Sequence, residues 1–273
     1  MGIQRSLLLL GVMALCWSSS TASNVLYTGG TLANNESIGL PGVGSFVMQQ
    51  DCDLVLYDNN GTVLFSTNTT GPSRQNCTLS LTNYGRLEVR TPDSELLWNS
   101  SNTNSPNGSY AAVFRPDGDV AIYGPLHWSG FARGHNMKTE KEQELLGNIP
   151  TVNNMLFSGQ VLYGNDELTN GLTSLKVRDC ELLQTWLFFS WPLVSVQGED
   201  CFVRLNFRGQ LTIIDDTGKN SSALPTAANP TKGEYVLILE GLLARIYGPS
   251  AWSTNVRGVQ PIVHLMLPSD AQE

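Results

Sequence analysis

Short runs that alternate apolar and polar residues recur along the chain, with Gly, Asn, Asp and Pro between them. A period of two is typical of strands that bury one face, and turn residues about every 10 positions indicate an all-β module. The clearest runs lie at Phe46–Tyr57, Leu79–Val89, Ala112–Tyr123, Phe202–Ile214 and Val236–Tyr247. We therefore expect an all-β protein.

The two halves of the chain repeat one pattern. Asn24–Leu32 (NVLYTGGTL) matches Asn154–Leu162 (NMLFSGQVL), and Tyr123–Trp128 (YGPLHW) matches Tyr247–Trp252 (YGPSAW). These matches, and a pair of cysteines within each half, follow the same order along the chain. They predict two homologous domains in tandem.

The segments outside the repeats differ in composition. Arg5, the apolar stretch Leu7–Trp17 and the small residues Thr21–Ser23 are typical of a secretory signal peptide, so we expect a secreted or vacuolar protein. The charged run Lys138–Glu144 indicates an exposed linker that a protease could cut. We expect a signal peptide at 1–23, a first domain at 24–132, a linker at 133–153, a second domain at 154–257 and a tail at 258–273. A removable propeptide is one hypothesis for the tail.

A longer period is visible inside the first half. Tyr57, Arg90 and Tyr123 lie 33 residues apart at equivalent strand ends, which predicts three β units. An aromatic segment follows each unit, at Leu64–Thr67, Leu96–Ser100 and Trp128–Gly130. We expect one aromatic side chain from each unit to meet around a shared axis.

Few residues are charged. Charged side chains make up 15% of the 273 residues, and the formal net charge is −8. Long solvated helices need more Lys, Glu and Arg than this, and an acidic chain without a basic patch is unsuited to nucleic acid. Apart from the short signal, no apolar segment is long enough to predict a membrane span.

Four cysteines follow the signal peptide, with spacings of 25 and 21 residues. Two local disulfides, Cys52–Cys77 and Cys180–Cys201, are the simplest interpretation in an oxidising compartment. A zinc site is the alternative, although the spacing lacks a C-x-x-C pair. Seven sequons indicate a glycoprotein if they are used: Asn35, Asn60, Asn68, Asn76, Asn99, Asn107 and Asn220.

The segment Met48–Tyr57 carries the candidate chemistry. If it forms one strand, a single face displays an amide, two carboxylates, an apolar residue and a phenol: Gln49, Asp51, Asp53, Val55 and Tyr57. Such a stripe suits a neutral sugar, whose hydroxyl groups need several fixed donors and acceptors. An ordinary solvent-facing strand is the alternative.

This stripe resembles the Gln-x-Asp-x-Asn-x-Val-x-Tyr motif of the bulb-type mannose-binding lectins of monocot plants, the snowdrop-agglutinin family. The repeated Tyr-Gly-Pro-x-x-Trp segments and the tandem arrangement resemble its two-domain precursors, which are often cut in the linker. The resemblance implies two tandem β-prism (type II) domains, each with three four-stranded sheets in pseudo-threefold symmetry. It also implies mannose or high-mannose glycans as ligands, oligomers of processed domains and no cofactor or metal.

The motif is altered in this chain. Asp53 stands where the family has Asn, so one hydrogen-bond donor is lost. The third unit keeps Asp117, Asp119 and Tyr123 but has Arg115 in place of Gln, which makes it a weaker second candidate. The remaining units lack the motif. We expect one weak or altered mannose site in the first domain and none of the standard kind in the second.

Catalysis is not indicated. The three His residues are isolated, and the sequence has no G-x-S-x-G, HExxH or phosphate-loop motif. We therefore expect no enzyme but a lectin used in defence or storage. The alternatives are a sugar-poor storage or protein-interaction relative on the same scaffold and a lectin with altered specificity for complex glycans.

Overall fold

The computed structural model describes residues 23–72, 74–101, 105–130, 153–164 and 166–256. Within these ranges the chain forms 24 strands and no helix, and therefore no helix that could span a membrane. All but the last residue of the predicted signal peptide, nearly all of the linker and the tail at 258–273 lie outside the described residues. The strands form six antiparallel four-stranded sheets, so the expected all-β class and β-prism sheets are confirmed.

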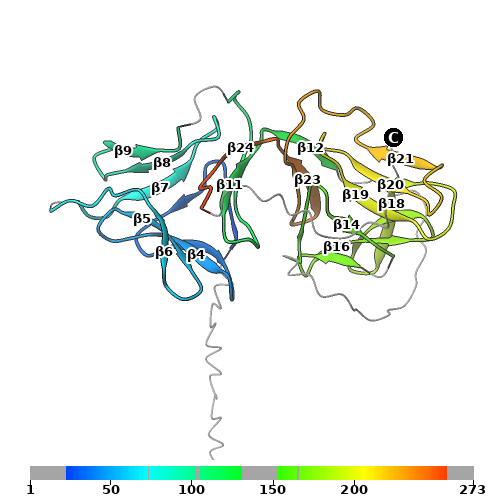
Figure 1. The fold of residues 1–273 in the computed structure, drawn as a ribbon, viewed down its shortest axis with the longest axis horizontal. Helices are drawn as coiled ribbons and strands as arrows, with labels where there is room; N and C mark the ends of the chain where they lie inside the picture. The colour runs from blue at the N-terminus through cyan, green and yellow to red at the C-terminus, as the bar shows by residue number, and fades with distance from the viewer. Residues whose placement is uncertain (1–22, 73, 102–104, 131–152, 165, 257–273) are drawn as a thin grey trace, which may run out of the picture.

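The first lobe contains three of these sheets (Figure 1). The sheet that carries the altered motif consists of β3 (Ser37–Leu40), β4 (Gly44–Met48), β5 (Leu54–Asp58) and β6 (Val63–Ser66). The next consists of β2 (Thr31–Leu32), β7 (Thr78–Leu81), β8 (Leu87–Arg90) and β9 (Leu96–Asn99). The third consists of β1 (Val25–Tyr27), β10 (Ala111–Phe114), β11 (Val120–Tyr123) and β24 (Ser250–Ser253).

The second lobe repeats this plan. Its sheets follow the same order as those of the first lobe. They are β15 (Glu167–Thr169), β16 (Thr173–Arg178), β17 (Glu181–Trp186) and β18 (Phe189–Ser195); β14 (Val161–Leu162), β19 (Phe202–Leu205), β20 (Leu211–Ile214) and β21 (Ser221–Leu224); and β13 (Met155–Phe157), β22 (Val236–Glu240), β23 (Leu243–Tyr247) and β12 (Leu126–Gly130).

The two halves exchange their last strands. β24 pairs with β11 in the first lobe, where Ile122 lies opposite Trp252, and β12 pairs with β23 in the second. Figure 1 shows β24 beside β11 and β12 beside β23. Each lobe is therefore completed by a strand from the other half. The two lobes therefore do not coincide with the sequence segments 24–132 and 154–257, because each lobe takes one strand from the other segment. The repeats do not predict this exchange.

The exchange corrects the expected aromatic cluster. In the first lobe the rings of Phe65, Trp98 and Trp252 have centroids 6.0–6.3 Å apart, and each pair meets edge to face. Trp128, which the sequence placed third in this group, packs instead against the core of the second lobe. The three-unit arrangement is thus present, with Trp252 in the place expected for Trp128.

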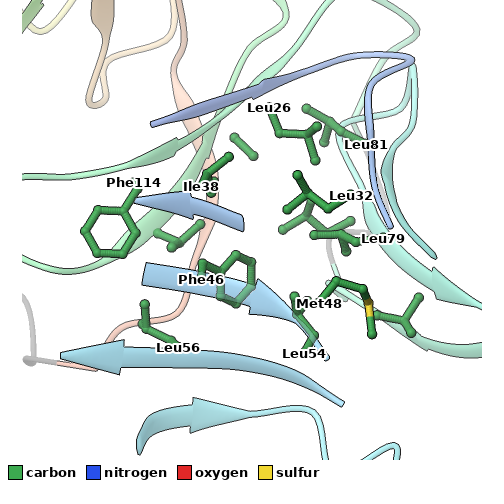
Figure 2. Packing of buried hydrophobic residues seen from close by; sticks show 14 of the residues in the cluster. Leu26, Leu32, Ile38, Phe46, Met48, Leu54, Leu56, Leu79, Leu81 and Phe114 are labelled. Carbon is green, nitrogen blue, oxygen red and sulfur yellow. The ribbon is translucent and has the colours of Figure 1, made fainter. Parts of the chain in front are cut away.

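Each lobe has its own apolar core. Figure 2 shows that of the first lobe, where Leu26, Phe46, Leu56 and Leu79 lie among other buried side chains from different sheets. The alternation read from the sequence accounts for these positions, because the inward residues of each strand meet at the centre of the prism. Both disulfides form as expected, with Cα–Cα distances of 5.2 Å for Cys52–Cys77 and 5.1 Å for Cys180–Cys201.

A third apolar cluster joins the lobes. It contains Val113 and Tyr123 from the first lobe and Met155, Phe157 and Tyr247 from the second, all buried. The ring of Tyr123 lies 6.2 Å from that of Phe157. The sheets that exchange strands therefore also pack against each other through their side chains.

Candidate functional site

The altered motif lies on a hairpin and not on one strand. β4 ends at Met48 and β5 begins at Leu54. Between them the backbone N–H of Gln49 donates to the backbone carbonyl of Asp53 (2.8 Å), and the backbone N–H of Cys52 donates to the backbone carbonyl of Gln49 (3.2 Å). Cys52 itself adopts a positive φ of 73°. The predicted continuous strand over Met48–Tyr57 is wrong, because a turn interrupts it.

The hairpin still brings part of the stripe together. Val47 lies opposite Val55, and Ser45 lies opposite Tyr57, so these side chains share one face of the sheet. The Gln49 side chain extends along this face, and its Nε2 donates to the Tyr57 hydroxyl oxygen at 2.6 Å. The pair thus retains the amide oxygen of Gln49 as an acceptor and the hydroxyl hydrogen of Tyr57 as a donor.

The two carboxylates of the turn differ in environment. Asp51 is exposed, and its Oδ1 accepts a hydrogen bond from the Asp53 backbone N–H at 3.1 Å. Asp53 is only 8% exposed. Val55 is 3% exposed, so it offers a ligand less apolar surface than its place in the stripe suggested. The accessible members of the stripe are therefore Gln49, Asp51 and Tyr57.

The Asp53 carboxylate is held by hydroxyl groups at the end of β6 and directly after it. Ser66 Oγ donates to Oδ2 at 2.6 Å, and Thr67 Oγ1 donates to Oδ1 at 2.8 Å. The Thr69 backbone N–H adds a longer contact of 3.4 Å. Hydrogen bonds to the charged form offset the cost of burying a carboxylate. Both oxygens of Asp53 are therefore engaged within the protein.

Sequence reasoning missed these hydroxyl residues. Ser66 lies opposite Val55 in the β5–β6 register, which places it beside the turn. The signal was the run Ser66-Thr67-Asn68-Thr69-Thr70, which starts at the last residue of β6 and contains four hydroxyl side chains. A buried acid in the preceding hairpin would need such donors.

The weaker candidate of the third unit is closed by its neighbours. The Arg115 guanidinium pairs with Asp117 (2.7 Å) and with Glu234 of the second lobe (3.1 Å). Tyr123 is 1% exposed, and this burial raises the pKa of its hydroxyl well above the usual range. The structure pairs Asp117 with Arg115 and buries Tyr123 in the apolar cluster between the lobes, so these side chains are engaged within the protein.

The third candidate residue of this unit, Asp119, is bound by the exchanged segment. Thr254 Oγ1 donates to Asp119 Oδ1 and accepts from the Val120 backbone N–H at 3.1 Å. Thr67 makes the same two contacts with Asp53 and Leu54 in the first unit. The third unit of the first lobe thus receives this hydroxyl group from the second half of the chain, through the residue after β24. The first unit receives its hydroxyl group from the first half.

The corresponding positions of the second lobe hold other interactions. Arg245 pairs with Glu240 at 2.5 Å, and Tyr247 is buried against the first lobe. Asn206 donates to Gln210, whose own amide donates to the Pro225 carbonyl at 3.0 Å. None of these arrangements reproduces the Gln–Tyr pair of the first lobe. Within the described ranges, no group of three or more His, Cys, Asp or Glu side chains is placed to hold a metal ion.

Comparison with known proteins yields one consistent group, although no family model matches the chain. The chain is 35% identical over 263 residues to mannose-specific lectin CEA of Colocasia esculenta, covering 94% of each chain. It is 38% identical over 260 residues to mannose-specific lectin 2 of Crocus vernus, covering 92% of this chain and 95% of the relative. A solved two-domain, fetuin-binding agglutinin of Scilla campanulata is similar with a TM-score of 0.68 and 25% identity, covering 85% of this chain and all of that one.

Proposed function

Since the chain belongs to the family of monocot mannose-specific lectins, we propose that it binds mannose-containing glycans through one site on the β4–β5 hairpin of the first lobe. The observation that carries this proposal is the Gln49–Tyr57 hydrogen bond beside the exposed carboxylate of Asp51. Together these three side chains present two acceptors and a donor on one accessible edge.

Each of these groups matches a need of a neutral sugar. A sugar hydroxyl donates one hydrogen bond and accepts others, so it binds best between a fixed acceptor and a fixed donor. Asp51 is a charged acceptor, and hydrogen bonds to charged groups are the stronger kind. Tyr57 is oriented by Gln49 and can direct its hydroxyl hydrogen toward the ligand.

Asp53 has a different role in this proposal. Its carboxylate lies behind the turn and fixes Ser66 and Thr67. Because the hydroxyl hydrogens of Ser66 and Thr67 are used by Asp53, these two groups can offer a ligand acceptors only. A site that lacks one donor binds more weakly by about 1–3 kcal/mol, which is roughly ten- to a hundredfold.

The Asp53→Asn substitution tests the site directly. Asn keeps the shape of Asp53 and releases Ser66 Oγ to accept or donate, so we expect mannose affinity to rise by roughly tenfold, within the energy of one hydrogen bond. A glycan array that includes high-mannose glycans and fetuin measures both affinity and specificity. Gln49→Ala and Asp51→Ala should abolish mannose binding.

The matched control is Asp93→Ala, which removes an exposed carboxylate from the β8–β9 turn and should leave binding unchanged. Strong mannose binding that survives both Gln49→Ala and Asp51→Ala would place the site elsewhere. Binding confined to fetuin would favour altered specificity over a mannose lectin.

We further propose that the chain enters the secretory pathway, is cut in the linker and associates into oligomers. The signal-like residues 1–23 and the charged run Lys138–Glu144 support the first two steps. Oligomers would raise the avidity of a chain that has one weak site. The intact mass of the purified protein and its mass in solution test these steps.

A further inference from the structure

The second lobe carries an exposed apolar hairpin tip. β17 and β18 are joined by Leu187 and Phe188 alone, since Trp186 lies opposite Phe189. Phe188 is 83% exposed and Leu187 is 63% exposed. Leu172, at 59%, lies in the adjacent β15–β16 turn. These three are the most exposed large apolar side chains among the described residues, and with Trp186 and Phe189 they form what we call the apolar tip.

Folding gives no reason for this composition. The equivalent hairpin of the first lobe, β5–β6, turns through Asp58–Thr62, where Gly61 supplies a positive φ of 80°. In the second lobe Leu187 has a positive φ of 53°, which a bulky residue rarely adopts. Only the first of the two turn residues has a positive φ, and two-residue hairpins of this kind favour Gly at that first position. The chain thus keeps a strained and solvent-exposed Leu-Phe turn where a polar turn would fold more easily.

The two turns that form the apolar tip, and the strand ends that flank them, carry no charged side chain. No Asp, Glu, Lys or Arg occurs in 169–175 or in 182–198. The nearest polar side chains are either used or buried. Ser174 and Thr185 bond each other at 3.0 Å, and Asn170 Oδ1 accepts from the backbone N–H groups of Leu172 and Thr173. The hydroxyl groups of Thr173 and Ser190 have no partner among the described residues, but both are buried and out of reach of a ligand. A sugar needs several free and fixed hydrogen-bonding groups, so the apolar tip is not suited to a carbohydrate.

The size and shape of the apolar tip indicate what it contacts. A stable protein interface buries about 800 Å² on each partner, more than a few side chains at the end of one hairpin can supply. A protruding tip that contains Trp and Phe instead fits the boundary between lipid headgroups and acyl chains, where such side chains are enriched. The backbone of the hairpin is paired across the strands, so shallow insertion would expose few unpaired polar groups.

We propose that the apolar tip inserts into the interfacial region of a neutral lipid bilayer. A neutral surface matches the uncharged tip and a chain whose formal net charge is −8. The contact is independent of the sugar site, which lies in the other lobe. A glycan and the membrane that bears it would then hold the protein at two points.

The test measures binding of the full chain to phosphatidylcholine vesicles by flotation. The double substitution Leu187→Gly with Phe188→Asn removes the two most exposed apolar side chains and places Gly where the turn has its positive φ. We expect vesicle partitioning to fall at least about tenfold, because each large side chain that leaves an apolar environment loses transfer free energy. The thermal midpoint should stay equal or rise, which shows that the variant is folded.

Tyr84→Asn is the matched control, since it removes an exposed aromatic side chain from a turn of the first lobe and should leave partitioning unchanged. Absence of binding by the natural chain at millimolar lipid would overturn the proposal, as would full binding by the double variant. Stronger binding to phosphatidylserine vesicles than to phosphatidylcholine vesicles would contradict the proposal that the bilayer is neutral. If the double variant bound vesicles as the natural chain does but changed in oligomeric mass, the tip would contact a second copy of the chain. If it changed instead in the glycan array, the tip would contact a glycan.

Discussion

Asp53 shows how a single substitution in a binding motif is accommodated. The acid is buried without a cation beside it in the described structure, and two hydroxyl groups and one backbone N–H hold it. Its carboxylate is thus part of the local packing behind the accessible edge and acts on that edge only through its hydroxyl partners. A change at Asp53 and a change at its hydroxyl partners should therefore have different effects on stability and on binding.

Ser66→Ala tests the structural part of this arrangement. It removes the 2.6 Å hydrogen bond to Asp53 and leaves a buried carboxylate oxygen without that donor. We expect the free energy of unfolding to fall by about 1–3 kcal/mol, as measured by denaturant titration. Combining it with Asp53→Asn should recover part of the loss. Ser221→Ala, at an exposed strand position of the second lobe, is the control, and an equal loss there would contradict the role assigned to Ser66.

His127 gives the exchanged strand β12 a dependence on pH. Burial lowers the pKa of His127, its Nδ1 lies 3.4 Å from the Asn229 amide, and its Nε2 is buried without a hydrogen-bond partner among the described residues. The folded protein therefore binds this proton less tightly than the unfolded chain. As pH falls through the unfolded value of about 6.5, the unfolded chain is protonated first and stability decreases.

His127→Gln should make that decrease smaller. The measurement is the free energy of unfolding of both proteins at about pH 7.5 and about pH 5, on either side of the ordinary His pKa. Other groups contribute equally to both proteins, so the difference between the two decreases isolates His127. An identical decrease in both would show that this side chain does not sense pH.

At the scale of elements, the exchange predicts that a substitution in one half of the sequence destabilises the lobe formed mainly by the other half. Trp252 belongs to the second half in sequence and contacts Phe65 and Trp98 in the first lobe. Trp252→Ala should therefore destabilise the first lobe, by roughly 2 kcal/mol or more. Amide hydrogen exchange should report faster opening in β5 and β8 and little change in β17 and β20.

Trp128→Ala is the reciprocal control, since Trp128 packs on the core of the second lobe. It should speed exchange in the second lobe and spare the first. If each substitution loosened instead the half in which it lies in the sequence, the strands would not be exchanged in solution.

These elements also show which features a sequence can predict. The strands, the repeats and both disulfides follow from alternation and spacing. The turn at 49–53 does not, because the polar residues Gln49, Asp51 and Asp53 continue through it with the period of a strand. The exchange of strands is hidden by the repeat itself, since two matching Tyr-Gly-Pro-x-x-Trp segments fit either lobe. One difference does distinguish them: Thr254 carries the hydroxyl that Asp119 accepts from, and Gly130 at the matching position has none.

On the scale of the whole molecule, the contact between the lobes limits the number of sugar sites. Tyr123 and Tyr247, which end the motif positions of the third unit in each half, are both buried in it. Arg115 joins Asp117 of the first lobe to Glu234 of the second. The positions of this unit that match the mannose-binding motif therefore lie at the contact that joins the two halves. This arrangement agrees with the proposal of one sugar site per chain, for which the proposed oligomers would supply multivalency.

The same contact predicts the outcome of cleavage in the linker 133–153. Each lobe contains a strand from the other half, and a buried apolar cluster joins the two sheets. A cut between the halves removes none of these interactions, so the fragments should remain associated. Limited proteolysis should give two fragments on a denaturing gel and one peak of the full mass in size-exclusion chromatography. Separate peaks for the two fragments without denaturant would contradict the exchange, whereas Trp252→Ala should weaken the association without changing the site of cleavage.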